Sequence, residues 1–195
     1  MLIQLPERNF RGYIFDCDGT LADSMPVHLK AWNQALAETG KSFPEELFYC
    51  WGGRTTPHIV ESLNQEFGWT LDVTGTARQK EECYLTLIPQ VRPISAVVEL
   101  VHAFYGKAPL AVASGGYRHL VIATLEVLGL VQFFNAIICA EDYEHGKPAP
   151  DPFLEAARRI GIIPEDCLVF EDSPTGRVAA AAAGMECVLV PREAN

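Results

Sequence analysis

The sequence has no apolar run long enough to cross a membrane and no excess of basic residues. A membrane-spanning helix needs about 20 consecutive apolar residues, and every apolar run here is much shorter. Lys and Arg total 15 against 25 Asp and Glu, giving a net charge of −10 without a basic patch that would bind nucleic acid. The first twelve residues are too short and too charged for a signal peptide. We therefore expect a cytoplasmic protein that binds neither membranes nor nucleic acids.

Closely paired cysteines, Gly/Ser linkers and low-complexity tracts are also missing. None of the six cysteines shows CxxC spacing, and several lie in apolar runs, so we expect buried, reduced thiols. With 49% hydrophobic and 21% charged residues, the 195-residue chain suits one core-forming domain with a smaller attachment. The sequence leaves the oligomeric state open, and we expect a monomer or a weak homodimer.

Short apolar runs recur along most of the chain and predict buried strands. They cover residues 13–15, 110–113, 136–139, 167–170 and 187–190, and none of them alternates with polar residues, as is typical of a parallel sheet. Helical spacing covers residues 94–105 and 118–129. Two further helices are expected to start at Asp151–Pro152, with Asp151 as the cap, and at Pro174, the latter ending near Gly184. The pattern predicts an α/β fold with a Rossmann-like parallel sheet of about five strands.

The segment after the first strand breaks this alternation. It contains no strand-like run and predicts helices at residues 26–40, 44–52, 57–68 and 73–88. An insertion of this length at the carboxyl end of a strand is where lids and substrate domains lie. We therefore predict a core domain of residues 1–22 and 90–195, with a small α-helical cap of residues 23–89 inserted after the first strand.

Polar side chains follow several of the predicted strands. Asp16 and Asp18 follow the first, Ser114 and Gly115 the second, and Glu171 and Asp172 the fourth, while Lys147 lies in the loop after the third. Ligands of open parallel sheets bind beyond the carboxyl ends of the strands, so these groups should converge. Carboxylates at such an edge need a cation, and oxygen ligands without nearby His or Cys favour Mg²⁺.

Two other ion- and phosphate-binding motifs fail on spacing. A calcium-binding loop starting at Asp16 would need glycine at its sixth position and glutamate at its twelfth, but Gly19 is fourth and Val27 twelfth. A Walker loop fails because no glycine lies five residues before Gly146.

Together, "DCDGTLADS", the serine after the second strand, the lysine of "GKPAPD" and "FEDSPTG" resemble the four motifs of the haloacid dehalogenase superfamily. They occur in the order of that family and span most of the chain. The inserted helices resemble the small cap of the β-phosphoglucomutase-like subfamily. Within it, the sequence looks most like sugar-phosphate phosphatases, such as those that act on fructose 1-phosphate.

The resemblance implies a role for each motif residue. Asp16 would be the nucleophile that forms an aspartyl phosphate, and Asp18 the general acid and base. Ser114, Gly115 and Lys147 would bind the phosphate, with Ser114 and Lys147 counted among the catalytic residues. The Mg²⁺ ligands would be Asp16, Asp18 through its backbone carbonyl, Glu171 and Asp172. The implied reaction requires one of these two acids to be ionised while its neighbour carries a proton, and Mg²⁺ would decide which. The implied partner is a small phosphorylated metabolite.

Other residues and other functions are less closely specified. Cap residues that could reach a sugar are Ser24, His28, Arg54, Thr56 and Lys80, although packing roles would suit them equally. A β-phosphoglucomutase is the alternative enzyme, but Thr56 stands where the mutase has a cap arginine, and Gly116-Tyr117 replaces its Ser-Lys pair. A phospho-acceptor signalling domain is the alternative of another class, disfavoured by the helical insertion.

Overall fold

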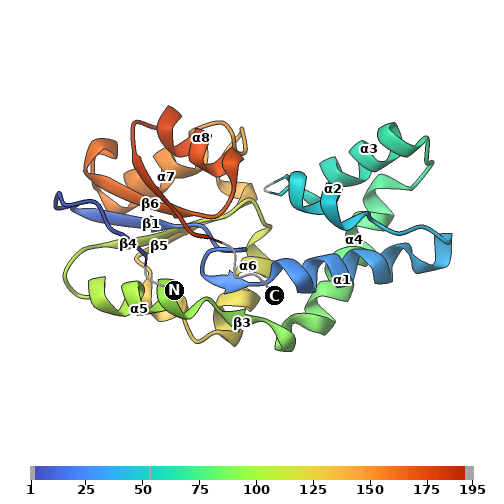
Figure 1. Cartoon of the computed structure of the whole chain (residues 1–195), viewed down its shortest axis with the longest axis horizontal. Helices are drawn as coiled ribbons and strands as arrows, with labels where there is room; N and C mark the ends of the chain where they lie inside the picture. Colours follow the sequence, from blue (N-terminus) through green and yellow to red (C-terminus); the bar gives the residue numbers. More distant parts are fainter. Residues whose placement is uncertain (1–2, 53, 192–195) are drawn as a thin grey trace.

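A computed structural model describes residues 3–52 and 54–191, which form an α/β core and a helical cap (Figure 1). The core contains a five-stranded parallel sheet in the order β5-β4-β1-β6-β7. Its strands are β1 (Gly12–Phe15), β4 (Leu110–Ala113), β5 (Ala136–Ile138), β6 (Cys167–Glu171) and β7 (Glu186–Leu189). The predicted fold class is confirmed. The predicted core domain also includes residues 1–2 and 192–195, which lie outside the described residues, as does Gly53 of the cap.

Helices cover both faces of the sheet, which explains why its strands are continuously apolar. Figure 1 shows α5 (Ser95–Phe104) and α6 (Arg118–Val127) on one face, and α7 (Asp151–Ile160) and α8 (Pro174–Ala182) on the other. In β1, Phe15 packs with the α5–α6 side, whereas its neighbour Ile14 packs with α7 and α8. Successive side chains of a strand point to opposite faces, so both must be apolar when both faces are covered.

Two helix starts test the predictions from capping residues. Helix α8 begins at Pro174 as predicted, and the Ser173 hydroxyl caps it by accepting the Gly176 N–H at 3.0 Å. At α7 the prediction was off by one residue, because Asp151 is the first helical residue and Pro150 precedes it. The Asp151 carboxylate is instead bound by the backbone N–H and ring of His145, at 3.2 and 3.1 Å.

The cap consists of α1 (Met25–Leu36), α2 (Glu45–Cys50), α3 (Thr56–Phe67) and α4 (Val73–Leu87), as predicted in number and place. The first of them is shorter than expected. It ends at Leu36, and a 3₁₀ turn (Ala37–Thr39) leads to Gly40, whose φ of 68° ends the helical region. Aromatic side chains fill the cap's own core, among them Trp32, Phe43, Phe48 and Trp51. Among the described residues, no helix combines the length and apolar character that crossing a membrane demands.

The chain enters and leaves the cap through two short paired strands that the sequence did not predict. Strand β2 (Ala22–Asp23) pairs antiparallel with β3 (Arg92–Pro93), so the two connections run side by side. Two-residue strands have no detectable hydrophobic period, and only the tertiary contact creates them. They lie close to the predicted domain boundaries. The remaining 3₁₀ turns are Ile88–Gln90, Val131–Phe133, Ala140–Asp142 and Pro164–Asp166.

All six cysteines are free, but they are not all buried as expected. Cys17, Cys139 and Cys167 are buried, Cys83 and Cys187 are partly exposed, and Cys50 is exposed. The exposure of Cys50 follows from its position as the last residue of α2, where its side chain lies outside the apolar face of the cap helix.

Candidate active site

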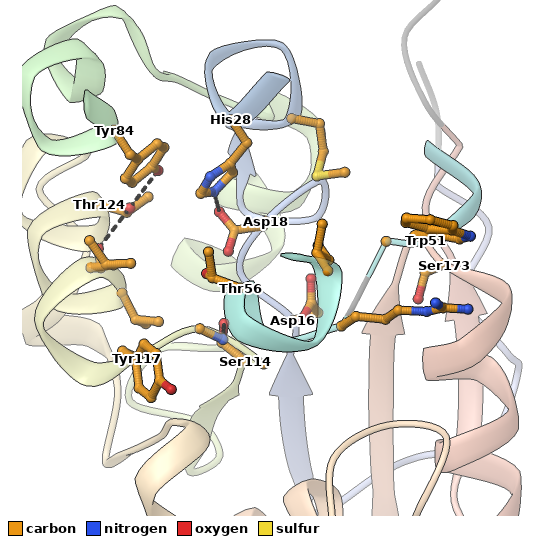
Figure 2. A pocket seen from close by; sticks show the side chains of 18 of the residues that line it. Asp16, Asp18, His28, Trp51, Thr56, Tyr84, Ser114, Tyr117, Thr124 and Ser173 are labelled. Carbon is orange, nitrogen blue, oxygen red and sulfur yellow. Dashed lines mark hydrogen bonds and ion pairs between the residues drawn. The ribbon is translucent and has the colours of Figure 1, made fainter. Parts of the chain in front are cut away.

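The predicted convergence of polar side chains at one edge of the sheet is observed. Asp16 follows β1, Ser114 follows β4 and Glu171 ends β6, and these three strands are neighbours. Their side chains, together with Asp18 and Lys147, line a cavity of about 110 Å³ between the core and the cap. Figure 2 shows Asp16, Asp18 and Ser114 facing this space from the core, with His28 and Trp51 facing it from the cap.

A buried ion cluster forms the floor of the cavity. The Lys147 ammonium donates to Asp16 Oδ1 at 2.6 Å and to Glu171 Oε1 at 2.8 Å, and the three side chains are 1%, 9% and 2% exposed. Burial alone would lower the pKa of Lys147, but the two carboxylates outweigh it and raise that pKa above its usual range. Lys147 is therefore a fixed cation next to Asp16.

The start of α8 orients Glu171. Its second oxygen, Oε2, accepts the Ser173 N–H at 2.6 Å and the Ser173 hydroxyl at 2.8 Å. Burial raises the pKa of Glu171, but Lys147 and Ser173 outweigh it and hold this pKa below its ordinary value. Gly176 packs directly against this carboxylate, since a Cβ there would lie 1.9 Å from Oε1. Glu171 thus has both oxygens engaged and little freedom to move.

Three acidic side chains at this edge could hold a metal ion. Asp16, Glu171 and Asp172 each offer an oxygen, and these oxygens lie within 4.8 Å of one another. Gly19, with φ +87°, approaches Asp172 so closely that a Cβ would lie 2.4 Å from Oδ2. Burial raises the pKa of Asp16, and the negative charges of Glu171 and Asp172 add to this effect against Lys147. This excess of carboxylate oxygens over cations fits a hard divalent cation such as Mg²⁺.

Asp18 is directed to the cap instead of to this acidic group. Its Oδ1 accepts the Ser24 hydroxyl at 2.5 Å and lies 3.1 Å from His28 Nε2. Lys80 Nζ lies 2.9 Å from the other ring nitrogen, His28 Nδ1. Because a protonated lysine can only donate, Nδ1 must accept and Nε2 must carry the hydrogen that it shares with Asp18. Lys80, His28 and Asp18 therefore form a continuous hydrogen-bonded chain.

The pKa shifts of Lys80, His28 and Asp18 agree with this hydrogen-bonded arrangement. Burial lowers the pKa of His28, and the Lys80 charge lowers it further despite Asp18, so the ring is neutral near pH 7. Burial lowers the pKa of Lys80 to about 8, although the nearby carboxylates oppose the shift. Burial would raise the pKa of Asp18, but His28 and Ser24 outweigh it and bring it to about 2.

The pKa values of the two aspartates are therefore shifted in opposite directions, upward for Asp16 and downward for Asp18. We expected one of the two acids to be ionised and the other protonated, with Mg²⁺ deciding which. The shifts differ because Asp16 lies among other acids while Asp18 lies near cap cations. A cation beside Asp16, Glu171 and Asp172 would favour ionised Asp16, because an opposite charge lowers a carboxyl pKa.

Ser114 and the two glycines after it form another wall of the cavity. The Ser114 hydroxyl accepts the Gly116 N–H at 3.0 Å, which leaves its hydrogen free to donate to a ligand. Gly116 lies close to Val121, since a Cβ there would come within 3.0 Å of that side chain. Ser114, Gly115 and Gly116 all line the cavity, as the predicted phosphate site requires.

The predicted cap residues occupy different places. His28, Arg54, Thr56 and Lys80 line the cavity, but Ser24 is fully buried against Asp18 and does not contact the space for a substrate. Arg54 lies at the rim, where its guanidinium is 5.1 Å from the centre of the Trp51 ring and donates to Ser62 Oγ at 3.2 Å.

Sequence reasoning missed Tyr84 and Thr124. The Tyr84 ring stacks on His28, with ring centres 3.9 Å apart, and its hydroxyl lies 2.8 Å from Thr124 Oγ1 (Figure 2). This buried hydrogen bond joins cap helix α4 to core helix α6. The signal in the sequence was the spacing of Tyr84, four residues after Lys80 and hence on the same face of a helix. Thr124 gave no signal.

Comparisons with known proteins agree with this site. The profile of the haloacid dehalogenase-like hydrolases matches residues 10–184. The fructose-1-phosphate phosphatase YqaB of Escherichia coli is 37% identical over 93% of this chain and 96% of its own length. A probable pseudouridine-5'-phosphatase of Drosophila melanogaster is 33% identical over 91% of this chain and 80% of its own length.

The fold is likewise shared with solved structures. The β-phosphoglucomutase of Clostridium difficile superposes with a TM-score of 0.80 at 22% identity, covering 91% of this chain and 83% of that one. At this identity the likeness shows the fold alone. The family profile and the more similar relatives carry the assignment to a family. The chain therefore belongs to the haloacid dehalogenase-like hydrolases, as a phosphoric monoester hydrolase.

Proposed function

We propose that the chain is a Mg²⁺-dependent phosphatase that hydrolyses a small sugar phosphate through an aspartyl-phosphate intermediate. The observation that carries the proposal is the buried cluster in which Lys147 lies between Asp16 and Glu171, with Asp172 beside them. Ser114 faces the same cavity, and the cap covers it. A cytoplasmic location and a monomeric or weakly dimeric state stay predictions.

In the first step, an Asp16 oxygen attacks phosphorus and the bond from phosphorus to the sugar oxygen breaks. Lys147, the Ser114 hydroxyl and the Gly115 N–H would hold the phosphoryl oxygens in place. The leaving oxygen takes a proton from Asp18. In the second step, water attacks the aspartyl phosphate, Asp18 accepts the proton of that water, and Asp16 leaves as a carboxylate. Atoms and charges then return to the starting state with orthophosphate released.

The cap network can deliver the proton that Asp18 needs in the first step. Lys80 passes a proton to His28 Nδ1 while His28 passes its Nε2 proton to Asp18, which leaves a neutral lysine and a protonated carboxyl. The 2.9 and 3.1 Å contacts provide the path for this transfer. In the protein alone the proton rests on Lys80, because the pKa of Lys80, about 8, exceeds that of Asp18, about 2.

Asp16, Glu171, Asp172 and the Asp18 backbone carbonyl would hold the Mg²⁺. When bound, the ion would neutralise the excess carboxylate charge and the charge of the phosphoryl group. Phosphate-monoester hydrolysis can require accelerations near 10²¹, or about 28 kcal/mol, while one well-placed donor supplies roughly 3–4 kcal/mol. No single residue of this site can therefore account for the reaction.

The walls of the cavity favour hydrolysis of a monophosphate over mutase chemistry. A mutase must bind a second phosphate, and the walls of this cavity include the uncharged side chains of Trp51, Tyr117 and Leu120. The lysines of the cavity are engaged near the aspartates, and Arg54 is held by Trp51 and Ser62 at the rim. The relative named for fructose 1-phosphate makes that sugar the first substrate to test.

The test measures orthophosphate release from fructose 1-phosphate and a panel of sugar, polyol and nucleoside phosphates, with and without Mg²⁺. We expect Mg²⁺-dependent release, its loss in Asp16→Asn, and a phosphoryl group on Asp16 in acid-quenched wild-type protein. Asp72→Asn, at an exposed position that does not line the cavity, is the matched control and should retain full activity. Turnover by Asp16→Asn would exclude the covalent mechanism. Isomerisation of glucose 1-phosphate faster than phosphate release would favour the mutase.

A further inference from the structure

A second cavity lies on the other side of Asp172, and the proposed reaction does not use it. It has a volume of about 340 Å³. Its walls come from the paired connections β2 and β3, the start of α1 and the cap helix α2. Asp172, a candidate metal ligand, and Met25 line both cavities. Asp172 can thus be reached from a side that does not pass through the substrate space.

The charges around the second cavity favour a cation. Asp23, Glu45 and Asp172 contribute carboxylates, and Asp23 and Glu45 are exposed at its mouth. Arg92 is the one basic side chain among the described residues that line it. Its guanidinium donates to the carbonyl oxygens of Pro89 and Val91, both at 3.0 Å. A cleft lined by one sign of charge raises the local concentration and association rate of the opposite ion.

The size of the second cavity also suits a hydrated ion. Mg²⁺ loses its water shell reluctantly, and six waters at about 30 Å³ each occupy roughly 180 Å³. The second cavity, at about 340 Å³, is large enough for such a complex. Gly19 forms the wall next to Asp172, and its missing Cβ leaves the carboxylate close to the backbone there.

We propose that this second cavity is the route by which the divalent cation reaches and leaves Asp172, separate from the entrance for the phosphorylated substrate. The inference rests on the metal site of the proposed function. Asp23 and Glu45 steer the ion to the mouth without becoming its final ligands. The metal could then exchange while a phosphate group occupies the space between Ser114 and Lys147.

The test measures the association rate of Mn²⁺, used as the probe, by stopped-flow quenching of tryptophan fluorescence; Trp51 and Trp32 line the catalytic cavity. We expect D23N/E45Q to bind Mn²⁺ roughly three- to tenfold more slowly than wild type at low ionic strength, and the difference to vanish near 0.5 M salt. E99Q/E126Q changes the net charge equally at exposed positions on α5 and α6, and should leave the rate unchanged. Turnover at saturating metal should be the same in all three proteins.

A plugged cavity gives a second, independent measurement. Pro26→Trp places a large side chain in the wall of the second cavity, and we expect it to slow both association and dissociation of Mn²⁺. Equal association rates of Mn²⁺ in D23N/E45Q and E99Q/E126Q, or unchanged Mn²⁺ kinetics in a folded Pro26→Trp protein, would overturn the proposed route. Neither result would contradict the proposed metal site. If Asp172→Asn binds Mn²⁺ as tightly as wild type, both the proposed metal site and the route are wrong.

Discussion

Replacing Lys147 with methionine should destabilise the fold strongly and in a pH-dependent way. The substitution keeps the approximate volume but removes the only cation that contacts both Asp16 and Glu171, at 2.6 and 2.8 Å, among the described residues. Removing one partner of a buried ion pair costs about 3–5 kcal/mol, because the remaining charge is left uncompensated. A domain of this kind has about 5–15 kcal/mol of total stability, so the loss would be a large fraction of it.

The sign of the pH dependence follows from Asp16. Its pKa in the folded protein is raised by burial and by the neighbouring carboxylates, and removing Lys147 raises it further. A carboxyl with a raised pKa binds its proton more tightly in the folded state. The pKa of Asp16 is about 3.9 in the unfolded state and higher in the folded state. The variant's free energy of unfolding should therefore fall as the pH rises through the range between these two pKa values. The gap between wild type and variant should be smaller at pH 5 than at pH 7.5.

Urea unfolding without divalent metal at these two pH values measures the effect. With an m-value of about 2 kcal/mol/M, the loss corresponds to a midpoint lower by roughly 1.5–2.5 M at pH 7.5. Lys107→Met, on an exposed turn, is the control and should change the midpoint little. Added Mg²⁺ should recover part of the stability of Lys147→Met. A variant within 1 kcal/mol of wild type at pH 7.5, or a loss that is equal at both pH values, would refute the assigned burial and pairing.

Three further predictions test other parts of the site. Gly176→Ala forces a Cβ against Glu171 Oε1, so it should cost about 1–3 kcal/mol in thermal unfolding and weaken Mg²⁺ binding in calorimetry; unchanged Mg²⁺ affinity would contradict the packing. Lys80→Met should remove an alkaline limb near pH 8 from the pH profile of kcat/KM, and a retained limb would exclude Lys80 as its source. Tyr84→Phe should cost about 1 kcal/mol, and Thr124→Val more, because the Thr124 hydroxyl also donates to Leu120 O at 2.9 Å. The double variant should lose less than the sum of the two, and strictly additive losses in urea unfolding would show that the Tyr84–Thr124 bond contributes nothing.

Much of the core could be predicted from local patterns because its strands are buried on both faces. The run 110–113 matched β4 residue for residue, and the other core strands were within one residue at each end. The paired strands β2 and β3 could not be predicted, since two residues carry no period and their pairing brings together positions about 70 residues apart. The one-residue error at Asp151 shows the same limit, because a cap depends on which partner the side chain finds.

Some residues of the candidate site could likewise be placed from the sequence, and others could not. Asp16, Ser114, Lys147 and Glu171 could be placed at one edge from the sequence, because parallel strands must bring their carboxyl ends together. The position of Ser24 could not, since whether a hydroxyl faces a substrate or an aspartate depends on how the cap docks. Tyr84 and Thr124 became visible only when α4 and α6 were brought into contact.

The sequence by itself determined which polar side chains the candidate site contains and at which strand ends they lie. Strand burial and the order of the motifs are local properties of the chain. Only the tertiary structure decided which charges surround each of the two aspartates, and hence in which direction each pKa shifts. Acids from β6 and its loop lie beside Asp16, whereas cap residues lie beside Asp18. Electrostatic energy depends on distance in space, and the spacing of residues along a chain does not contain that distance.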